Sequence, residues 1–149
     1  MKMEGSERIP APREAVWAAL NDPDVLRECI PGCQSMEKVS DTELKATVQI
    51  KMGPVKAKFD GEVELTDIDA PESYTIKGSG KGGVAGHASG ASHVRLTKAG
   101  EETDLAYDVD AQVGGKIAQL GSRLIDSTAK KLAGQFFGNL RKHFEGGAA

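Results

Sequence analysis

The sequence predicts an α+β fold in which a curved antiparallel sheet of about seven strands packs against one long C-terminal helix. Residues 34–113 alternate between apolar and polar side chains with a period of two, which is typical of strands with one dry face. Residues 114–144 instead repeat apolar side chains at steps of three and four, which indicates an amphipathic helix. The 149 residues suit a single domain over 1–145, followed by a short flexible tail over 146–149.

Before the alternating region, one strand and two short helices are expected. Residues 2–9 alternate weakly and are predicted to form the first strand, which ends at Pro10. Pro12 fits the first turn of a short helix, because a proline there loses no hydrogen bond. Asp22 can cap a second short helix over residues 23–29.

Turn-forming residues divide the alternating region into an antiparallel meander. Turns are predicted at 40–41, 53–54, 70–71, 82–83 and 99–100. One face of the strands is apolar and includes Leu44, Val48, Ile50, Phe59, Val63, Leu65, Tyr74, Ile76, Ser92, Val94, Leu105, Tyr107 and Val109. The opposite face carries the charged side chains, among them Lys51, His87, His93 and Asp108. The sheet is therefore dry on one side and wet on the other.

The last predicted helix, residues 114–144, is long enough to cross the whole sheet, since some thirty residues make a rod of roughly 45 Å. Its apolar stripe should lie on the dry face, with Leu120 and Leu124 turned toward the strands. One strand, two short helices, a meander and a long closing helix form a helix-grip arrangement. Glycines at 78, 80 and 90 would let the strands bend around the helix.

Composition excludes several classes of function. The net charge of −3 gives no indication of nucleic-acid binding. The N-terminus is charged where a secretory signal is apolar, and no run of eighteen apolar residues occurs, so a cytoplasmic protein is expected. Cys29 and Cys33 are expected to be reduced thiols, because a cytosolic pair with no further ligands nearby suits neither a disulfide nor a zinc site. No metal site is predicted.

No catalytic residue is predicted either. From Leu44 onward the dry face of the strands carries no Asp, Glu, His, Lys or Arg, so a general acid or base has no place there. His87 and His93 fall on the wet face, and His143 falls in the last helical turn, where a cation is favourable in any case.

Small residues occur on both walls of the expected core, including Ala46, Ala57 and Ala88 in the strands and Ala118 and Ala129 in the helix. Protein cores are packed nearly to crystal density. The small residues therefore indicate either close approach of helix and sheet or a pocket for an apolar ligand. Composition alone leaves both readings open.

Several segments together resemble one known family. They are RIPAPREAVW at 8–17, NDP at 21–23, CIPGC at 29–33, GPVKAKFDG at 53–61, GSGKGG at 78–83 and VGGKIAQLGSRLI at 113–125. Nearly the whole chain is similar to the family of the carbon monoxide dehydrogenase G subunit, a branch of the START-like helix-grip superfamily. The CIPGC turn and the Gly-Gly-Lys entry to the last helix are the most specific of these segments.

The resemblance implies a non-enzymatic accessory protein that binds a lipophilic molecule, with a quinone as the candidate ligand. Its expected partner is a molybdenum-dependent carbon monoxide dehydrogenase or a related hydroxylase, which it would assist in membrane recruitment, maturation or electron transfer. Longer members carry a C-terminal membrane anchor. This chain stops at Ala149 without one, so contact with the inner membrane face is expected to be peripheral at most.

A ligand held between sheet and helix would contact a defined set of residues. The predicted cavity is lined by Leu26, Leu44, Val48, Ile50, Phe59, Val63, Tyr74, Ile76, Tyr107, Val109, Leu120, Leu124 and Thr128. The predicted partner surface is the turn with Cys29, Pro31, Gly32 and Cys33, because the meander does not need it. Two alternatives remain open: an assembly factor with a solid core that acts through its surface, and a helix-grip enzyme such as a cyclase or hydrolase.

Overall fold

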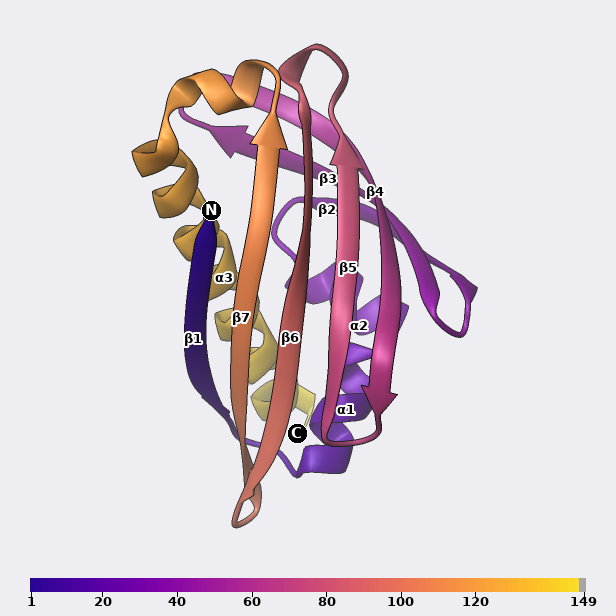
Figure 1. Ribbon diagram of the computed structural model, residues 1–149. Helices are drawn as coiled ribbons and strands as arrows, with labels where there is room; N and C mark the ends of the chain where they lie inside the picture. The colour runs from indigo at the N-terminus through magenta and orange to yellow at the C-terminus, as the bar shows by residue number, and fades with distance from the viewer. Residues whose placement is uncertain (148–149) are drawn as a thin grey trace.

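The computed structural model describes residues 1–147 and shows the predicted order of elements (Figure 1). The strands are β1 (Lys2–Ile9), β2 (Cys33–Ser40), β3 (Glu43–Met52), β4 (Val55–Asp69), β5 (Ser73–Lys81), β6 (His87–Ala99) and β7 (Glu102–Gly114). The α-helices are α1 (Arg13–Leu20), α2 (Pro23–Cys29) and α3 (Ser122–Gly147). Short 3₁₀ turns, η1 (Gly83–Ala85) and η2 (Lys116–Leu120), precede β6 and α3.

The strands form one seven-stranded antiparallel sheet in the order β1-β7-β6-β5-β4-β3-β2. Strands β2 to β7 follow one another as a meander, while β1 lies at the opposite edge beside β7. Helices α1 and α2 therefore carry the chain from one edge of the sheet to the other. The α+β helix-grip prediction is confirmed.

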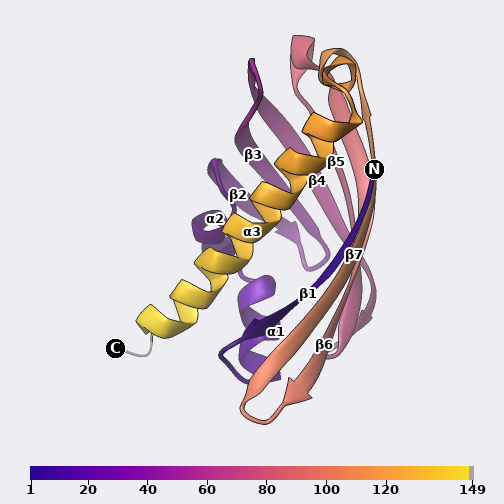
Figure 2. The same ribbon diagram turned by 90° about the vertical axis from the view of Figure 1, so that its left-hand side faces the viewer.

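The strand register confirms the predicted dry face. Leu44 lies opposite Val63, and Val63 lies opposite Gly78 on the next strand. Directly paired residues of antiparallel strands point to the same face, so the apolar positions of neighbouring strands adjoin each other. This face is the concave one, and α3 crosses it diagonally in Figure 2.

Both short helices form, but Pro12 is the N-cap residue of α1 and not part of its first turn as predicted, whereas α2 starts at its predicted cap. The Asp22 carboxylate accepts a hydrogen bond from the backbone N–H of Asp24 (2.9 Å), and Pro23 occupies the first turn of α2. The cap satisfies a backbone donor that has no partner inside the helix, which explains why this segment starts a helix at that point.

The last helix begins later than predicted. A single helix from residue 114 is wrong, because Gly115 and Gly121 adopt φ values of +79° and +92° on either side of η2. An α-helix requires negative φ, so the first turns are separated from α3. The described part of α3 extends to Gly147, two residues into the predicted tail. Residues 148–149 of that tail lie outside the described residues.

The best-packed part of the core lies where the N-terminal elements meet the C-terminal turns of α3. Ile9, Val16, Leu96 and Leu140 are at most 2% exposed there. Burial of these side chains supplies much of the stabilisation of the fold. Within residues 1–147, no helix is long and apolar enough to cross a membrane.

Candidate functional site

An apolar cavity of about 380 Å³ lies between the concave face of the sheet and α3. Strands β1 to β7 contribute to its wall, and α1, α2 and α3 close the other sides. Part of the lining set predicted above meets here: Leu26, Leu44, Val63, Tyr74, Ile76, Tyr107 and Val109. All of these except Leu26 lie on strands, where alternation brings them to one face, so the period-two pattern was sufficient to find them.

The other predicted lining residues lie away from this cavity. Ile50, Leu124 and Thr128 line a neighbouring groove between β3 and α3. Val48, Phe59 and Leu120 contribute to neither wall. Two packing contacts near the β3–β4 turn explain why Phe59 and Leu124 do not reach the cavity. The Phe59 ring covers Gly82, and a Cβ at Gly53 would lie 2.7 Å from Cδ2 of Leu124. Leu124 therefore packs on the β3–β4 turn.

Further residues of the lining were missed. Some of them could have been found from periodicity, because they lie on faces that were predicted to be apolar. On the dry face of the strands these are Leu65, Ser92, Val94 and Leu105, and on the apolar stripe of the helix they are Leu132, Ala133 and Phe136. The other missed residues reach the lining only through the way in which α1, α2 and the edge strands pack over the sheet. They are Met3, Leu20, Ile30, Met36 and Phe137. Periodicity within one segment carries no information about such contacts.

The lining is apolar and neutral. Among the described residues that form it, none is an Asp, Glu, His, Lys or Arg, and its polar side chains are the hydroxyls of Tyr74, Ser92 and Tyr107. Burial raises the pKa of Tyr74. Burial, together with the Glu7 carboxylate, also raises the pKa of Tyr107. Both phenols are therefore protonated at neutral pH, and the described lining holds no carboxylate, imidazole or amine.

Polar contacts hold α3 in place beside the cavity. Arg141 forms an ion pair with Glu7 of β1, and its Nε donates a hydrogen bond to the backbone oxygen of Arg8 (3.1 Å). Asn139 Nδ2 donates to the backbone oxygen of Cys29 (3.0 Å). These bonds tie the C-terminal half of the helix to the edge strand and to α2.

The predicted partner surface is not a separate surface. Cys29 is fully buried (0% exposed), so its inclusion in a docking surface is wrong. Pro31 lines both the cavity and the neighbouring groove, and Gly32 lines the groove. Cys33 is half-buried, and its thiol donates to the backbone oxygen of Ser35 (3.3 Å). Burial raises the pKa of both thiols, which lowers their reactivity.

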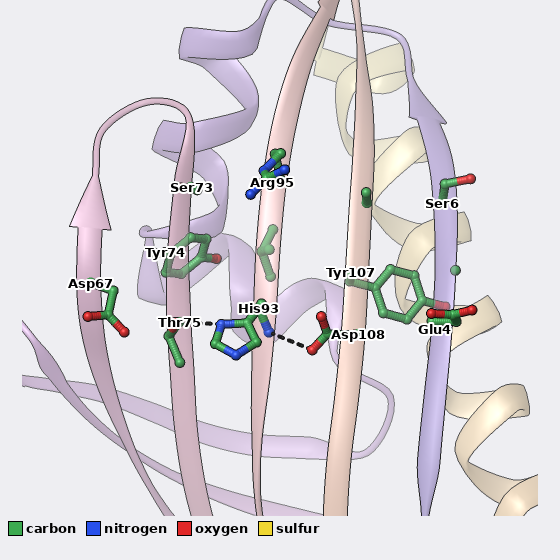
Figure 3. A pocket seen from close by; sticks show the side chains of 13 residues that line it. Glu4, Ser6, Asp67, Ser73, Tyr74, Thr75, His93, Arg95, Tyr107 and Asp108 are labelled. Carbon is green, nitrogen blue, oxygen red and sulfur yellow. Dashed lines mark hydrogen bonds between the residues drawn. The ribbon is translucent and has the colours of Figure 1, made fainter.

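A second hollow, of about 860 Å³, lies on the convex face over β1, β7, β6, β5 and the end of β4 (Figure 3). His93 and Asp108 face this open groove, as the wet-face assignment predicted. A hydrogen bond joins Thr75 Oγ1 and His93 Nδ1 (2.7 Å), but the Asp108 carboxylate accepts from the backbone N–H of His93 (3.4 Å). A nucleophile–histidine–carboxylate triad requires the acid to orient the ring, so these residues do not form one. Within residues 1–147, no group of three potential metal ligands occurs.

Comparison with solved structures supports the fold. A conserved protein from Geobacillus kaustophilus is 37% identical, with a TM-score of 0.90 over 96% of this chain and 94% of that chain. A START superfamily protein from Mycobacterium smegmatis is 13% identical, with a TM-score of 0.67 over 95% and 97% of the two chains. The Zhui aromatase/cyclase from Streptomyces sp. R1128 is 12% identical, with a TM-score of 0.63 over 97% and 95%. At 13% and 12% identity, the last two similarities establish the START-like fold alone.

None of the curated proteins compared with this chain matches it. The sequence profile of the G subunit of carbon monoxide dehydrogenase (CoxG) matches residues 5–144, which is nearly the whole chain. The chain therefore belongs to the CoxG family, the family of the carbon monoxide dehydrogenase G subunit.

Proposed function

We propose that this protein is a non-enzymatic accessory protein that holds a lipophilic molecule in the cavity between the sheet and α3. The observation that carries the proposal is the cavity itself: about 380 Å³, walled by apolar side chains from both layers of the fold. Native cores rarely contain voids larger than a water molecule, so a hollow of this size is a feature to be filled. It falls within the range of small-molecule sites, about 300 to 1,000 Å³.

The cavity also favours this proposal over the two alternatives. An assembly factor that acts only through its surface would have a solid core, without a hollow in the range of ligand sites. Catalysis of the cyclase type is favoured by a carboxylate, imidazole or amine beside the substrate, and the described lining offers none of these, only hydroxyls. The aromatase/cyclase among the similar structures supports the fold and carries no argument for catalysis here.

The proposed partner is a molybdenum-dependent carbon monoxide dehydrogenase or a related hydroxylase. Support comes from the family, whose name places its members with carbon monoxide dehydrogenase. A quinone is the candidate ligand, since a lipophilic electron acceptor would link such an enzyme to the membrane. The proposed location is the cytoplasm, with peripheral contact at the inner membrane face.

Ligand binding is tested with a neutral apolar fluorophore such as Nile red and its displacement by decylubiquinone. We expect saturable binding to the wild type and a loss of at least about tenfold in affinity for Ala133→Leu, which adds volume to the cavity wall. Ala106→Leu is the matched control, because it makes the same change on the exposed convex face. Equal binding by all three proteins, or none by the wild type, would contradict the proposal.

The partner is tested separately with a purified molybdenum hydroxylase. We expect the wild type loaded with decylubiquinone to accept electrons from the reduced enzyme faster than free decylubiquinone at the same concentration. Ala133→Leu should give no acceleration. If the loaded wild type gives none either, the ligand-binding proposal stands and the proposed partner does not.

A further inference from the structure

Positive charge gathers at one end of the sheet, where the β3–β4 turn, η1 and η2 lie together (Figure 1, Figure 2). The η1 turn contacts both β4 and η2 there. This basic end comprises residues 49–60, 79–87 and 112–126. Its exposed cations are Lys51, Lys56, Lys58, Lys81, Lys116 and Arg123, and its carboxylates are Asp60 and Asp126. The whole chain has a net charge of −3, so the excess negative charge lies elsewhere on the molecule.

The strand register places like charges side by side at the basic end. Lys51 lies directly opposite Lys56, and both side chains are exposed on the convex face. Further along the same strand, Lys45 lies between Glu37 and Glu62. In the described part of the chain, neither Lys51 nor Lys56 forms an ion pair. Like charges directly opposite each other destabilise a sheet, and an anionic partner bound there would offset that cost.

An apolar side chain projects into solvent from the same end. Val84 in η1 is 94% exposed, whereas the next residue, Ala85, is 3% exposed. Gly86 packs so closely on the end of β7 that a Cβ there would lie 2.2 Å from the backbone oxygen of Gly114. A packed loop therefore holds Val84 in water, where an aliphatic side chain gains nothing. Such a residue amid lysines is typical of a surface that meets a bilayer.

We infer that the basic end is the surface by which this protein docks on a bilayer with anionic phospholipids, with Val84 inserted below the headgroups and the lysines beside the phosphates. This inference rests on the proposed function, which includes peripheral membrane contact, and names the surface and the lipid class. Lysines near an anionic leaflet each strengthen binding. A nucleic acid would attract the lysines as well but offers no hydrocarbon layer to Val84.

The charge distribution also determines the orientation of the docked protein. Because the net charge of the chain is negative, an anionic surface repels the molecule as a whole and attracts only its basic end. The protein should therefore dock with the β3–β4 turn, η1 and η2 toward the lipid, and the attraction should weaken with salt.

The test is cosedimentation with vesicles of phosphatidylcholine, either alone or with about 30% phosphatidylglycerol, at neutral pH and low ionic strength. We expect the wild type to bind the mixed vesicles at least about tenfold more tightly than the neutral ones. Lys51→Gln/Lys56→Gln should weaken binding to the mixed vesicles by about tenfold or more. Val84→Gln should weaken it about fivefold, because less apolar area is buried. Addition of salt should reduce the lysine effect and leave the Val84 effect.

Two matched controls change the same kinds of side chain outside the basic end. Lys45→Gln/Lys77→Gln removes the same charge from exposed convex positions, and both of these lysines lie opposite acids. Ile68→Gln changes a side chain that is 47% exposed at the far end of β4. Both controls should bind the mixed vesicles as the wild type does, and thermal unfolding should show that all variants are folded.

The inference fails if the wild type binds neither kind of vesicle, if it binds both equally, or if the controls lose as much binding as the basic-end variants. Preference for a DNA duplex over the mixed vesicles would also overturn it and would assign the basic end to nucleic acid. Nile red binding, measured without vesicles, separates the two proposals. If Nile red binds and the vesicles do not, the inference fails and the cavity proposal stands, whereas absence of Nile red binding contradicts the proposed function itself.

Discussion

The space enclosed by the sheet and the helices has a filled end and a hollow part. At the filled end, Ile9, Val16, Leu96 and Leu140 are at most 2% exposed. In the hollow part, Leu132, Ala133 and Phe136 face the cavity and are only partly buried. Both parts are built from the same apolar face of the sheet and the same helix.

The two parts differ in which helices cover the dry face of the sheet. At the filled end, α2 packs against α3, and buried residues of α1 join the same cluster as Phe137 and Leu140, so side chains from the sheet meet several elements. Over the hollow part, α3 crosses the curved sheet diagonally (Figure 2), and a cavity of about 380 Å³ remains between helix and sheet. Apolar alternation therefore specifies which face is dry, while the elements opposite decide whether that face is packed or hollow.

The largest expected effect compares two leucines of α3. Leu140→Ala should lower the free energy of unfolding by about 3 to 5 kcal/mol, because the side chain is 1% exposed and its removal leaves a void. Leu132→Ala should cost about 1 kcal/mol, since Leu132 already borders a cavity. Urea unfolding of both variants measures this. The helix propensities cancel in the pair, so similar losses would contradict the division into filled and hollow parts.

The cysteines make a similar comparison near α2. Cys29→Ser should cost about 1 to 3 kcal/mol, because it places a hydroxyl in the buried cluster at the filled end. Cys33→Ser should stay within about 0.5 kcal/mol, as expected at a partly exposed edge position. A thiol reagent should label Cys33 well before Cys29 in the native protein. Faster labelling of Cys29 would show that this end opens.

Tyr74 lies at the boundary of the two parts, since it belongs to the buried cluster and also lines the cavity. Its pKa is raised by burial, so the folded state keeps the proton at a pH where the unfolded state releases it. The stability contributed by Tyr74 is therefore complete below the unfolded pKa of about 10. It is lost as the pH rises above that value, by up to about 1.4 kcal/mol per pH unit.

Tyr74→Phe should remove this part of the alkaline loss, measured by urea unfolding between pH 9 and pH 11 at about half-unit steps. Tyr107→Phe is the control, because Tyr107 is less buried and its removal should change the slope less. An unchanged slope in Tyr74→Phe would show that water reaches the Tyr74 hydroxyl from the cavity.

The smallest expected effect concerns the ion pair that ties α3 to the edge of the sheet. Glu7→Gln should lower stability by no more than about 1 kcal/mol, because Glu7 and Arg141 both keep contact with solvent. The loss should shrink in 1 M NaCl, whereas Glu4→Gln on the opposite face of β1 should have no such salt-dependent effect. A loss above 2 kcal/mol would mean that the pair fixes the helix more tightly than its exposure indicates.

Much of the site could be predicted because its residues follow local rules. Val63, Ile76 and Val109 were found from alternation alone, since successive strand side chains point to opposite faces. Leu124 was assigned to the cavity because it belongs to the apolar stripe of a helix that was expected to run unbroken from residue 114. The left-handed conformation of Gly121 moves its start to Ser122, and Leu124 packs on the β3–β4 turn. A glycine within an apolar repeat does not reveal which φ it will adopt.

The sequence by itself determined the order of the elements, the dry face of the sheet and the absence of charge from it beyond Leu44, because periodicity, turn residues and caps act over a few positions. Only the tertiary structure decided where the dry face is filled and where it is hollow, and that Cys29 is buried. These properties depend on the angle at which α3 crosses a curved sheet. That angle results from contacts between residues more than a hundred positions apart, such as Glu7 with Arg141 and Cys29 with Asn139.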